Sequence, residues 1–379
     1  MMDYEALRFI WWVLIGVLLI GFVVTDGFDM GVASLLKVIG RSNEERRVMI
    51  NSIAPHWDGN QVWLITAAGA LFAAWPTVYA ASFSGFYFAM MLTLFALFLR
   101  PIGFEYRAKI DSPEWRDRWD WALTAGSAIP ALIFGVAFGN LLQGVPFHFD
   151  DILRLHYTGS FWALLNPFAL LVGVFSLLMI VNHGAVYLQL KTEGELLQRS
   201  ERLASVLGVV CAALFVLCGF WLWVGIDGYV VTSVMDTQAA SQPTTKTVEV
   251  VAGAWFNNYQ QWPLLWLLPV LGVLSFVASA WFSRMARHAW AFVSSGAAMA
   301  MVLMTTGVTM FPFLMPSSSV PSHSLTMWDA TASETSLFIM FIVACLFVPL
   351  VLAYTAWGYF VMRGRLNEQH IRDNSHSLY

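Results

Sequence analysis

Charged side chains are scarce in this chain, and their scarcity argues against a water-soluble fold. Only 12% of the 379 residues are Asp, Glu, Lys or Arg, whereas 58% are hydrophobic; an ordinary soluble domain has roughly 25% charged residues. A soluble fold of this length needs polar side chains over most of its surface, whereas lipid tails accept Leu, Phe and Trp directly. The composition therefore predicts an integral membrane protein. The sequence also lacks a block of basic residues, so nothing in it indicates nucleic-acid binding.

Paired metal or haem ligands are missing as well. The three cysteines lie in apolar runs without CxxC spacing, which indicates packing residues: Cys211, Cys218 and Cys345. The histidines fall at predicted helix ends, in external loops or in the C-terminal tail, and no two face each other within the membrane: His56, His148, His156, His183, His288, His323, His370 and His376. Haem iron needs axial ligands such as His, Met or Cys. If haem takes part in the function, another chain must hold most of it.

Long apolar runs define the predicted membrane spans. A run of about 20 residues is needed to cross about 30 Å of hydrocarbon, and the first run lacks the small-residue cleavage site of a signal peptide, so it is expected to be retained. Eight runs qualify: 9–28, 78–99, 121–143, 161–183, 203–226, 263–283, 288–311 and 336–360. A ninth segment, 55–75, is ambiguous because it begins with the polar sequence His56-Trp57-Asp58-Gly59-Asn60-Gln61.

The distribution of Lys and Arg supports the ninth span. These residues gather in cytoplasmic loops of membrane proteins. With the segment 55–75 included, 17 of the 20 fall on one side and only Arg8, Arg154 and Lys246 on the other, whereas omitting it mixes the two sets. We therefore predict an all-α protein with nine transmembrane helices, a periplasmic N-terminus and a cytoplasmic C-terminus. Residues 1–362 form one transmembrane domain, and 363–379 form a short cytoplasmic tail.

Two of the predicted connections between spans lie on the external side. A tight external turn is expected at Pro76-Thr77, and an external loop rich in Ser, Thr and Gln follows from about Val231 to Trp262. We interpret that loop as solvated, although a partner could also bind there, and its part from Thr244 to Val251 looks free to vary. The small residues between Ala67 and Ala74 favour close helix packing over a path for gas or substrate.

Ionisable residues inside spans are the candidates for function, because each costs roughly 3 kcal/mol to insert. Asp26 and Asp29 are three residues apart and so share one helical face, Asp58 begins the ninth segment, and Arg100 with Glu105 closes the third span. Together they could form a half-channel for protons from the cytoplasm. Alternatively, Arg100 is a snorkelling anchor, Glu105 lies in a loop, and Asp29 or Asp58 caps a helix or pairs with Arg100.

Seven sequence segments together resemble subunit II of the cytochrome bd-type quinol oxidases, over the whole length of the chain. They are DYE and LRFIWW in 3–12, TDGFDMG at 25–31, NSIAPHWDGNQVW at 51–63, GVAFGNLLQGVPF at 135–147, GIDGY at 225–229, FPFLMPSS at 311–318 and SLTMWD at 324–329. Each segment alone is short, but the combination is highly specific.

The resemblance implies a subunit of a terminal oxidase of a bacterial inner membrane. Such an enzyme oxidises quinol, either ubiquinol or menaquinol, and reduces oxygen to water with protons taken from the cytoplasm. Subunit I would ligate haem b and haem d, and this chain, inactive without it, would scaffold subunit I. Small single-span accessory subunits are further expected partners, and a quinone or lipid could bind in this subunit.

The resemblance also assigns residues. Asp29, Asp58 and Arg100 match positions on the proton route, Glu105 is an acidic position there, and Asp26 and His56 flank the route. Trp63 matches a position associated with oxygen access. The helices would form two groups of four with one peripheral helix. The alternative function is a proton-coupled secondary transporter, which also places carboxylates inside spans, although usually with broken helices and a site near the midplane.

Overall fold

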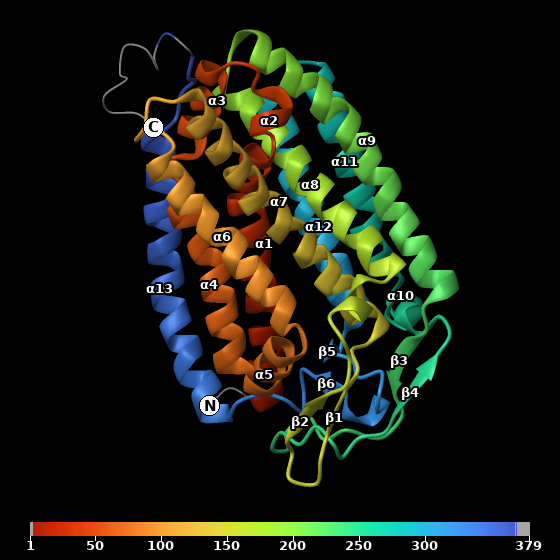
Figure 1. Ribbon diagram of the computed structural model, residues 1–379. Helices are drawn as coiled ribbons and strands as arrows, with labels where there is room; N and C mark the ends of the chain where they lie inside the picture. The colour runs from red at the N-terminus through yellow and green to blue at the C-terminus, as the bar shows by residue number, and fades with distance from the viewer. Residues whose placement is uncertain (1–2, 368, 370–379) are drawn as a thin grey trace.

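The structure is a computed structural model that describes residues 3–367 and residue 369. Long helices run side by side between the two ends of the molecule (Figure 1). Within the described residues, eight helices are long and apolar enough to cross a bilayer, and the bent pair α4–α5 supplies a ninth candidate. The eight are α1 (Tyr4–Ser34), α6 (Tyr87–Tyr106), α7 (Pro113–Gln143), α8 (Pro167–Lys191), α9 (Gly194–Gly225), α11 (Leu267–Arg284), α12 (His288–Met310) and α13 (Glu334–Val361). The structure is therefore that of a multi-pass helical membrane protein, as predicted.

The two ends of the bundle differ in structure. One end, here called the α3 end, carries the short helices α2 (Leu36–Ile39) and α3 (Asn43–Ile53), and α13 finishes there (Figure 1). The opposite end, here called the hairpin end, carries three antiparallel two-stranded sheets. Their strands are β1 (Phe147–Phe149) with β2 (Leu155–Tyr157), β3 (Gly228–Val231) with β4 (Val248–Val251), and β5 (Phe313–Met315) with β6 (Leu325–Thr326). Short helical turns complete this end: η1 (Trp162–Leu165), η2 (Ala254–Phe256), α10 (Asn257–Gln261), η3 (Pro263–Trp266) and η4 (Pro321–His323).

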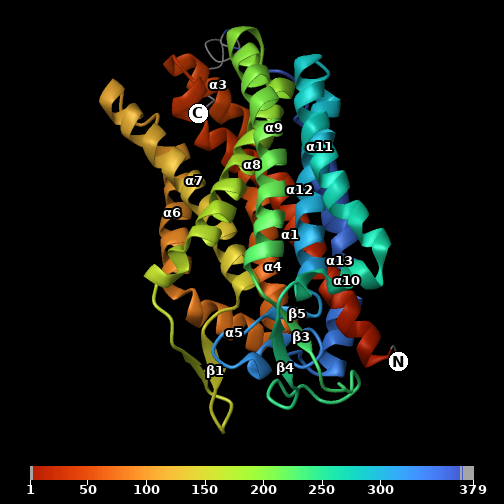
Figure 2. The same cartoon turned by 90° about the vertical axis from the view of Figure 1, so that its right-hand side faces the viewer.

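The long helices form one continuous bundle (Figure 2). Helix α1 packs on α4 (Trp57–Ala74), α7, α8 and α12, and the series α6, α7, α8, α9, α11 and α12 packs each on the next. The division into two groups of four that the resemblance implied stays a prediction. Helix α13 lies at the edge, against α1 and α4, and Leu337 is its one buried residue in the part of the chain described here. The remaining surface of α13 is apolar and suited to lipid or a partner.

Glycine allows α1 and α8 to cross in direct backbone contact. A Cβ atom on Gly31 would collide with the carbonyl oxygen of Ile180 and lie 2.8 Å from the Cα of Gly184. Small residues at such crossings let helices approach closely, which is how packing stabilises membrane bundles in the absence of a hydrophobic driving force. Because α1 carries Asp26 and Asp29, this crossing also sets the depth of the acidic residues.

The third predicted span is wrong in its position. The chain leaves α4 at Trp75, and α5 (Pro76–Gly85) then runs at 120° to α4 before α6 begins at Tyr87. Proline disfavours the helical conformation of the residue before it, and Trp75 indeed has φ −130° and ψ 70°. The apolar run from 78 to 99 hid this break, because α5 and the start of α6 are both apolar. Consequently Arg100 does not close a span but lies inside α6.

The external loop predicted to be solvated is largely exposed, but part of it is structured, and its predicted freedom to vary stays a prediction. Strand β4 pairs with β3, and Lys246, in the stretch that looked free to vary, is only 5% exposed. Its Nζ lies 2.7 Å from Oδ2 of Asp329. The predicted cytoplasmic tail is described only for residues 363–367 and 369, and the rest of it, with His370 and His376, lies outside the described residues.

We predict that Gly31→Ala destabilises the protein, because the added methyl group meets backbone atoms of α8 that cannot move aside. Overpacking of this kind costs about 1–3 kcal/mol. The measurement is the fraction of purified protein that stays monodisperse in detergent after heating. Gly16→Ala is the matched control, since a Cβ there, on the same helix, meets nothing within 4 Å. Equal heat resistance of the two variants would refute the close-contact interpretation.

Candidate functional site

A buried ion pair joins α1 to α6. Arg100 Nη1 donates to Asp26 Oδ2 at 2.9 Å, and Nη2 donates to Oδ1 at 2.6 Å. Both residues are fully buried, and the guanidinium also lies 5.9 Å from the centre of the Trp57 ring. Two parallel N–H···O bonds of this kind are the strongest arrangement available to arginine and a carboxylate. Arg100 therefore forms an ion pair and does not snorkel to the membrane surface. Its partner is Asp26, whereas Asp29 or Asp58 was expected from the sequence.

Asp29 lies one turn further along α1 and is also fully buried. Its Oδ2 accepts a hydrogen bond of 2.7 Å from Asn60 Nδ2 of α4, while its Oδ1 has no hydrogen-bond partner among the described residues. Asp26 and Arg100 pair with each other, so Asp29 is the carboxylate of this cluster that forms no ion pair among the described residues.

Asn60 connects Asp29 to the peripheral helix. The hydroxyl of Tyr359 on α13 donates to Asn60 Oδ1 at 2.6 Å. The His56 ring, just before α4, stacks on the Tyr359 ring with centroids 4.4 Å apart. His56 thus contacts Tyr359, and its predicted place beside a proton route stays a prediction.

Asp58 points to the other side of α4. It is exposed, as are Gly59, Val62, Ile65 and Gly69, which follow at helical spacing and form one outer face of α4. The Asp58 carboxylate makes no hydrogen bond or ion pair with any described residue. The structure therefore does not bring Asp58 into the buried cluster of Asp26, Asp29 and Arg100.

The remaining two predicted residues lie apart from the ion pair. Glu105 is exposed near the end of α6 at the α3 end, in the helix and not in a loop. Trp63 is partly buried on α4 and packs against α1, where a Cβ on Gly21 would lie 2.5 Å from its ring. Among the small residues of α4, Ala67 and Ala74 are buried in helix contacts, as the packing interpretation predicts, but Gly69 faces outward.

Sequence reasoning missed two members of the site. Asn60 stands in the polar head of α4, so the same polarity that drew attention to Asp58 could have found it. Tyr359 carries no such signal, because tyrosine is ordinary near the end of an apolar helix. Only the packing of α13 against α4 brings it to Asn60.

The most buried histidine of the described residues, on α8, has no ring nitrogen free to bind haem iron. His183 is fully buried but already uses both ring nitrogens, Nδ1 with Ser295 Oγ at 2.9 Å and Nε2 with the Val24 carbonyl oxygen at 3.0 Å. Its ring also stacks on Phe292. No group of three His, Cys, Asp or Glu side chains within the described ranges is placed to hold a metal ion.

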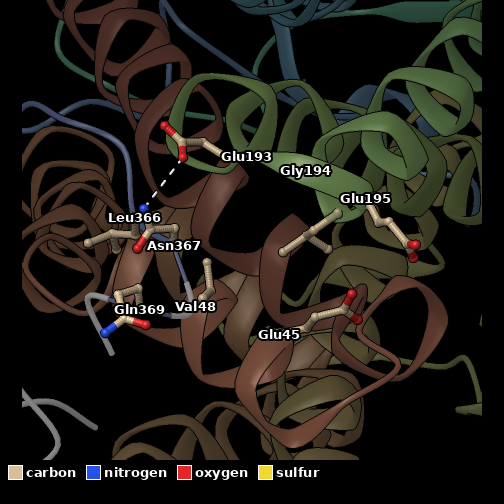
Figure 3. Close-up of a pocket in the computed structure, with 9 residues that line it drawn as sticks. Glu45, Val48, Glu193, Gly194, Glu195, Leu366, Asn367 and Gln369 are labelled. Atoms are coloured by element: carbon tan, nitrogen blue, oxygen red, sulfur yellow. Dashed lines mark hydrogen bonds between the residues drawn. The ribbon is translucent and has the colours of Figure 1, made fainter. Parts of the chain in front are cut away.

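A second group of carboxylates lines a hollow of about 480 Å³ at the α3 end, separate from the ion pair (Figure 3). Glu193 accepts a hydrogen bond from Asn367 there. Glu45 caps α3 together with Ser42 and pairs with Arg199. Although burial alone would raise the pKa of Glu45, its hydrogen bonds from Arg199 and the backbone lower it. These contacts hold helix ends together, and we assign no chemistry to the hollow.

The bundle and its buried charges define a polytopic membrane protein built around an ionisable cluster near one end of its spans. Comparison with known families is more specific. The chain belongs to the cytochrome bd terminal oxidase subunit II family, whose model matches residues 7–362. It is 58% identical to the cytochrome bd-I ubiquinol oxidase subunit 2 of Escherichia coli K12, over 100% of both chains.

More distant relatives agree with this assignment. The cytochrome bd ubiquinol oxidase subunit 2 of Bacillus subtilis is 32% identical, over 96% of this chain and 98% of that one. A solved structure of bd oxidase from Geobacillus thermodenitrificans shares the fold, with a TM-score of 0.66 at 15% identity, over 94% of this chain and 99% of the other. The family assignment supports the oxidase interpretation and not the secondary transporter.

We predict that removing one partner of the buried ion pair is more harmful than removing both. An uncompensated buried charge costs about 3–5 kcal/mol, whereas a well-packed apolar pair is often neutral. Arg100→Met should be worst, since it leaves Asp26 and Asp29 together without a cation, and Asp26→Leu with Arg100→Met should recover stability. Heat resistance of the purified protein measures this, with the exposed Arg118→Met as control. Equal stability of all variants would show that the pair does not hold α1 to α6.

Proposed function

We propose that this chain is subunit II of a respiratory terminal oxidase in a bacterial inner membrane, which oxidises quinol and reduces oxygen to water. The full-length similarity to ubiquinol oxidase subunits of Escherichia coli and Bacillus subtilis supports this proposal. The quinol is ubiquinol or menaquinol. The partner is subunit I, which this chain scaffolds and without which it is inactive, together with small single-span accessory subunits.

Haem b and haem d belong to subunit I in this proposal, in keeping with the engaged nitrogens of His183. When bound there, they supply electron transfer and the reduction of oxygen. Water formation consumes protons, and this chain contributes to their uptake through its own carboxylates. Subunit II is thus a membrane scaffold with a proton-conducting role, and a quinone or lipid could occupy it as well.

The main support for a proton-conducting role is the exposed carboxylate of Asp58. An ionised group facing lipid costs roughly 3 kcal/mol, and Asp58 has neither a described partner nor cover within this chain. A partner subunit on the outer face of α4 would remove it from lipid and supply water or polar groups. Asp58 would then collect protons at the boundary of the two subunits, near the α3 end.

The buried cluster supplies the next position for a proton. Arg100 and Asp26 hold a fixed ion pair, and Asp29 changes charge beside it. A proton that reaches Asp29 would bind the one carboxylate of the cluster that the Arg100–Asp26 pair does not use. Glu105 at the α3 end and His56 beside Tyr359 flank this route, and Trp63 lies on the oxygen-access side of α4.

The proposal places the α3 end in the cytoplasm and the hairpin end in the periplasm. In support, the Lys and Arg residues at the α3 end include Lys37, Arg107 and Lys191, whereas Arg8, Arg154 and Lys246 are at the hairpin end. This is the distribution expected of cytoplasmic and external surfaces. Protons for water formation would then enter from the side on which Asp58 lies.

Cysteine labelling in spheroplasts tests the orientation. Asp151→Cys, in the β1–β2 loop, should react with a membrane-impermeant maleimide in intact spheroplasts. Ser42→Cys, at the start of α3, should react only after lysis. The background needs Cys345→Ala, because Cys345 is exposed on α13, while Cys211 is buried. Labelling of position 42 before lysis would overturn the proposed orientation.

We predict that Asp58→Asn lowers quinol:oxygen turnover of the assembled complex severalfold while its haem content stays near that of the parent. The amide keeps the size of the side chain but cannot take up or release a proton at this position. Oxygen consumption per haem is the measurement. Asp151→Asn is the control, since it removes an exposed carboxylate at the opposite end. Unchanged oxygen uptake by the fully haem-loaded Asp58→Asn variant would refute the proton role of Asp58.

A further inference from the structure

Asp29 is held by one oxygen only. Asn60 Nδ2 donates to Oδ2, and the buried Oδ1 is left without a partner within the described chain. Buried polar atoms are nearly always satisfied, so an exception of this kind points to function or to water. An ionised carboxylate only accepts hydrogen bonds, and the N–H of Asn60 already occupies the Oδ2 side. Oδ1 is therefore the atom that is free to bind a proton.

The orientation of Asn60 depends on Tyr359. An amide presents either its oxygen or its NH₂ group to a neighbour, and the hydrogen bonds around it decide which. The Tyr359 hydroxyl donates to Asn60 Oδ1, which turns Nδ2 toward Asp29. Tyr359 is itself held by the stacked His56 ring at 4.4 Å and by edge contact with Phe28 at 6.3 Å between centroids.

Tyr359 lies on a peripheral helix whose hydrogen bonds to the bundle include Trp11 Nε1 to the Leu337 carbonyl oxygen and Lys191 Nζ to that of Met362. Most of α13 is exposed, and its contacts with the bundle are to α1 and α4 (Figures 1 and 2). Near the α3 end, the side-chain hydrogen bond to Asn60 is what ties α13 to α4. The position of α13 is thus linked, through two hydrogen bonds, to the Asp29 carboxyl group.

A cavity reaches Tyr359 from the α3 end. Its volume is about 460 Å³, and its walls include Thr25 and Phe28, which are next to Asp26 and Asp29 in α1. By volume the cavity has room for several water molecules, and Thr25, Tyr187, Lys191 and Tyr359 supply polar groups in a mostly apolar lining. Phe292 also lines it. This cavity lies on the α13 side of the cluster, whereas Asp58 faces outward from α4.

We propose that Asn60 and Tyr359 are positioning residues for proton transfer at Asp29. They hold the carboxyl group by Oδ2 so that an Oδ1–H bond forms as an O–H bond of a protonated water chain breaks, and the reverse step returns the proton to water. Displacement of α13 would release Asn60 and change how Asp29 is held. This inference rests on the proposed function, because it assumes that Asp29 carries protons in the oxidase.

Redox-induced infrared difference spectra of the assembled complex test the inference directly. The carboxyl C=O band that Asp29→Asn removes identifies Asp29. Tyr359→Phe keeps the ring and its stacking but removes the hydroxyl, so it should shift that band and lower turnover per haem by about threefold to tenfold. Asn60→Leu should have a larger effect on both. Tyr354→Phe is the control, because Tyr354 is 72% exposed on the same helix.

The outcomes separate this inference from the proposed function. If Asp29→Asn leaves turnover unchanged, the proton role of the cluster fails. If Asp29→Asn slows turnover but Tyr359→Phe and Asn60→Leu keep the parent's band and rate, the positioning role alone is overturned. A merely structural role would lower haem content without moving the band. If Asn60→Leu does not assemble, Asn60→Ser, which keeps a donor in smaller form, gives the same comparison.

Discussion

The ion pair between Arg100 and Asp26 is the constraint on which the rest of the site depends. A fully buried arginine needs a carboxylate with both oxygens in place, and the two hydrogen bonds provide it. This requirement determines how α1 and α6 face each other. It also leaves Asp29 as the carboxylate of this buried group that forms no ion pair among the described residues. The proposed proton role of Asp29 therefore depends on the packing at Arg100.

Helix α4 places its polar side chains in two different surroundings. Asn60 points inward to Asp29, and Asp58, two residues earlier, points outward and is exposed. Residues two apart on a helix lie on nearly opposite faces, so one short polar segment serves both the core and the outer surface. The break at Trp75–Pro76 ends α4 at the hairpin end, and α5 then carries the chain across to α6. Asp58 and the residues around Asp29 thus lie near the α3 end of the bundle.

The sequence was sufficient for the class of protein, for α4 as a helix and for the acidic residues, because charge is conspicuous in an apolar chain. It could not say which carboxylate pairs with Arg100, since Asp26 and Asp29 share one face of α1 and only the approach of α6 distinguishes them. It misplaced the third span because α5 and α6 are both apolar. It also missed Tyr359 and the burial of Lys246, which depend on contacts between residues 299 and 83 positions apart, respectively.

The hairpin end holds a buried arginine and a buried lysine–aspartate pair. There the buried Arg8 guanidinium donates to Thr331 Oγ1 and to backbone carbonyl groups of residues 237 and 239. Burial raises the pKa of Asp329 and lowers that of Lys246, and their 2.7 Å contact opposes both shifts. The buried charges of this end are thus used to fasten loops to α1 and α13. The α3 end uses charges in the same way: Asp120 pairs with Arg46 and Arg107, and Glu45 pairs with Arg199. Asp58 and the Oδ1 of Asp29 differ from these carboxylates, because neither makes a hydrogen bond or ion pair within the described chain. In a chain with so few charges, most buried ones are paired, and the proposed proton uptake uses the two positions that are not.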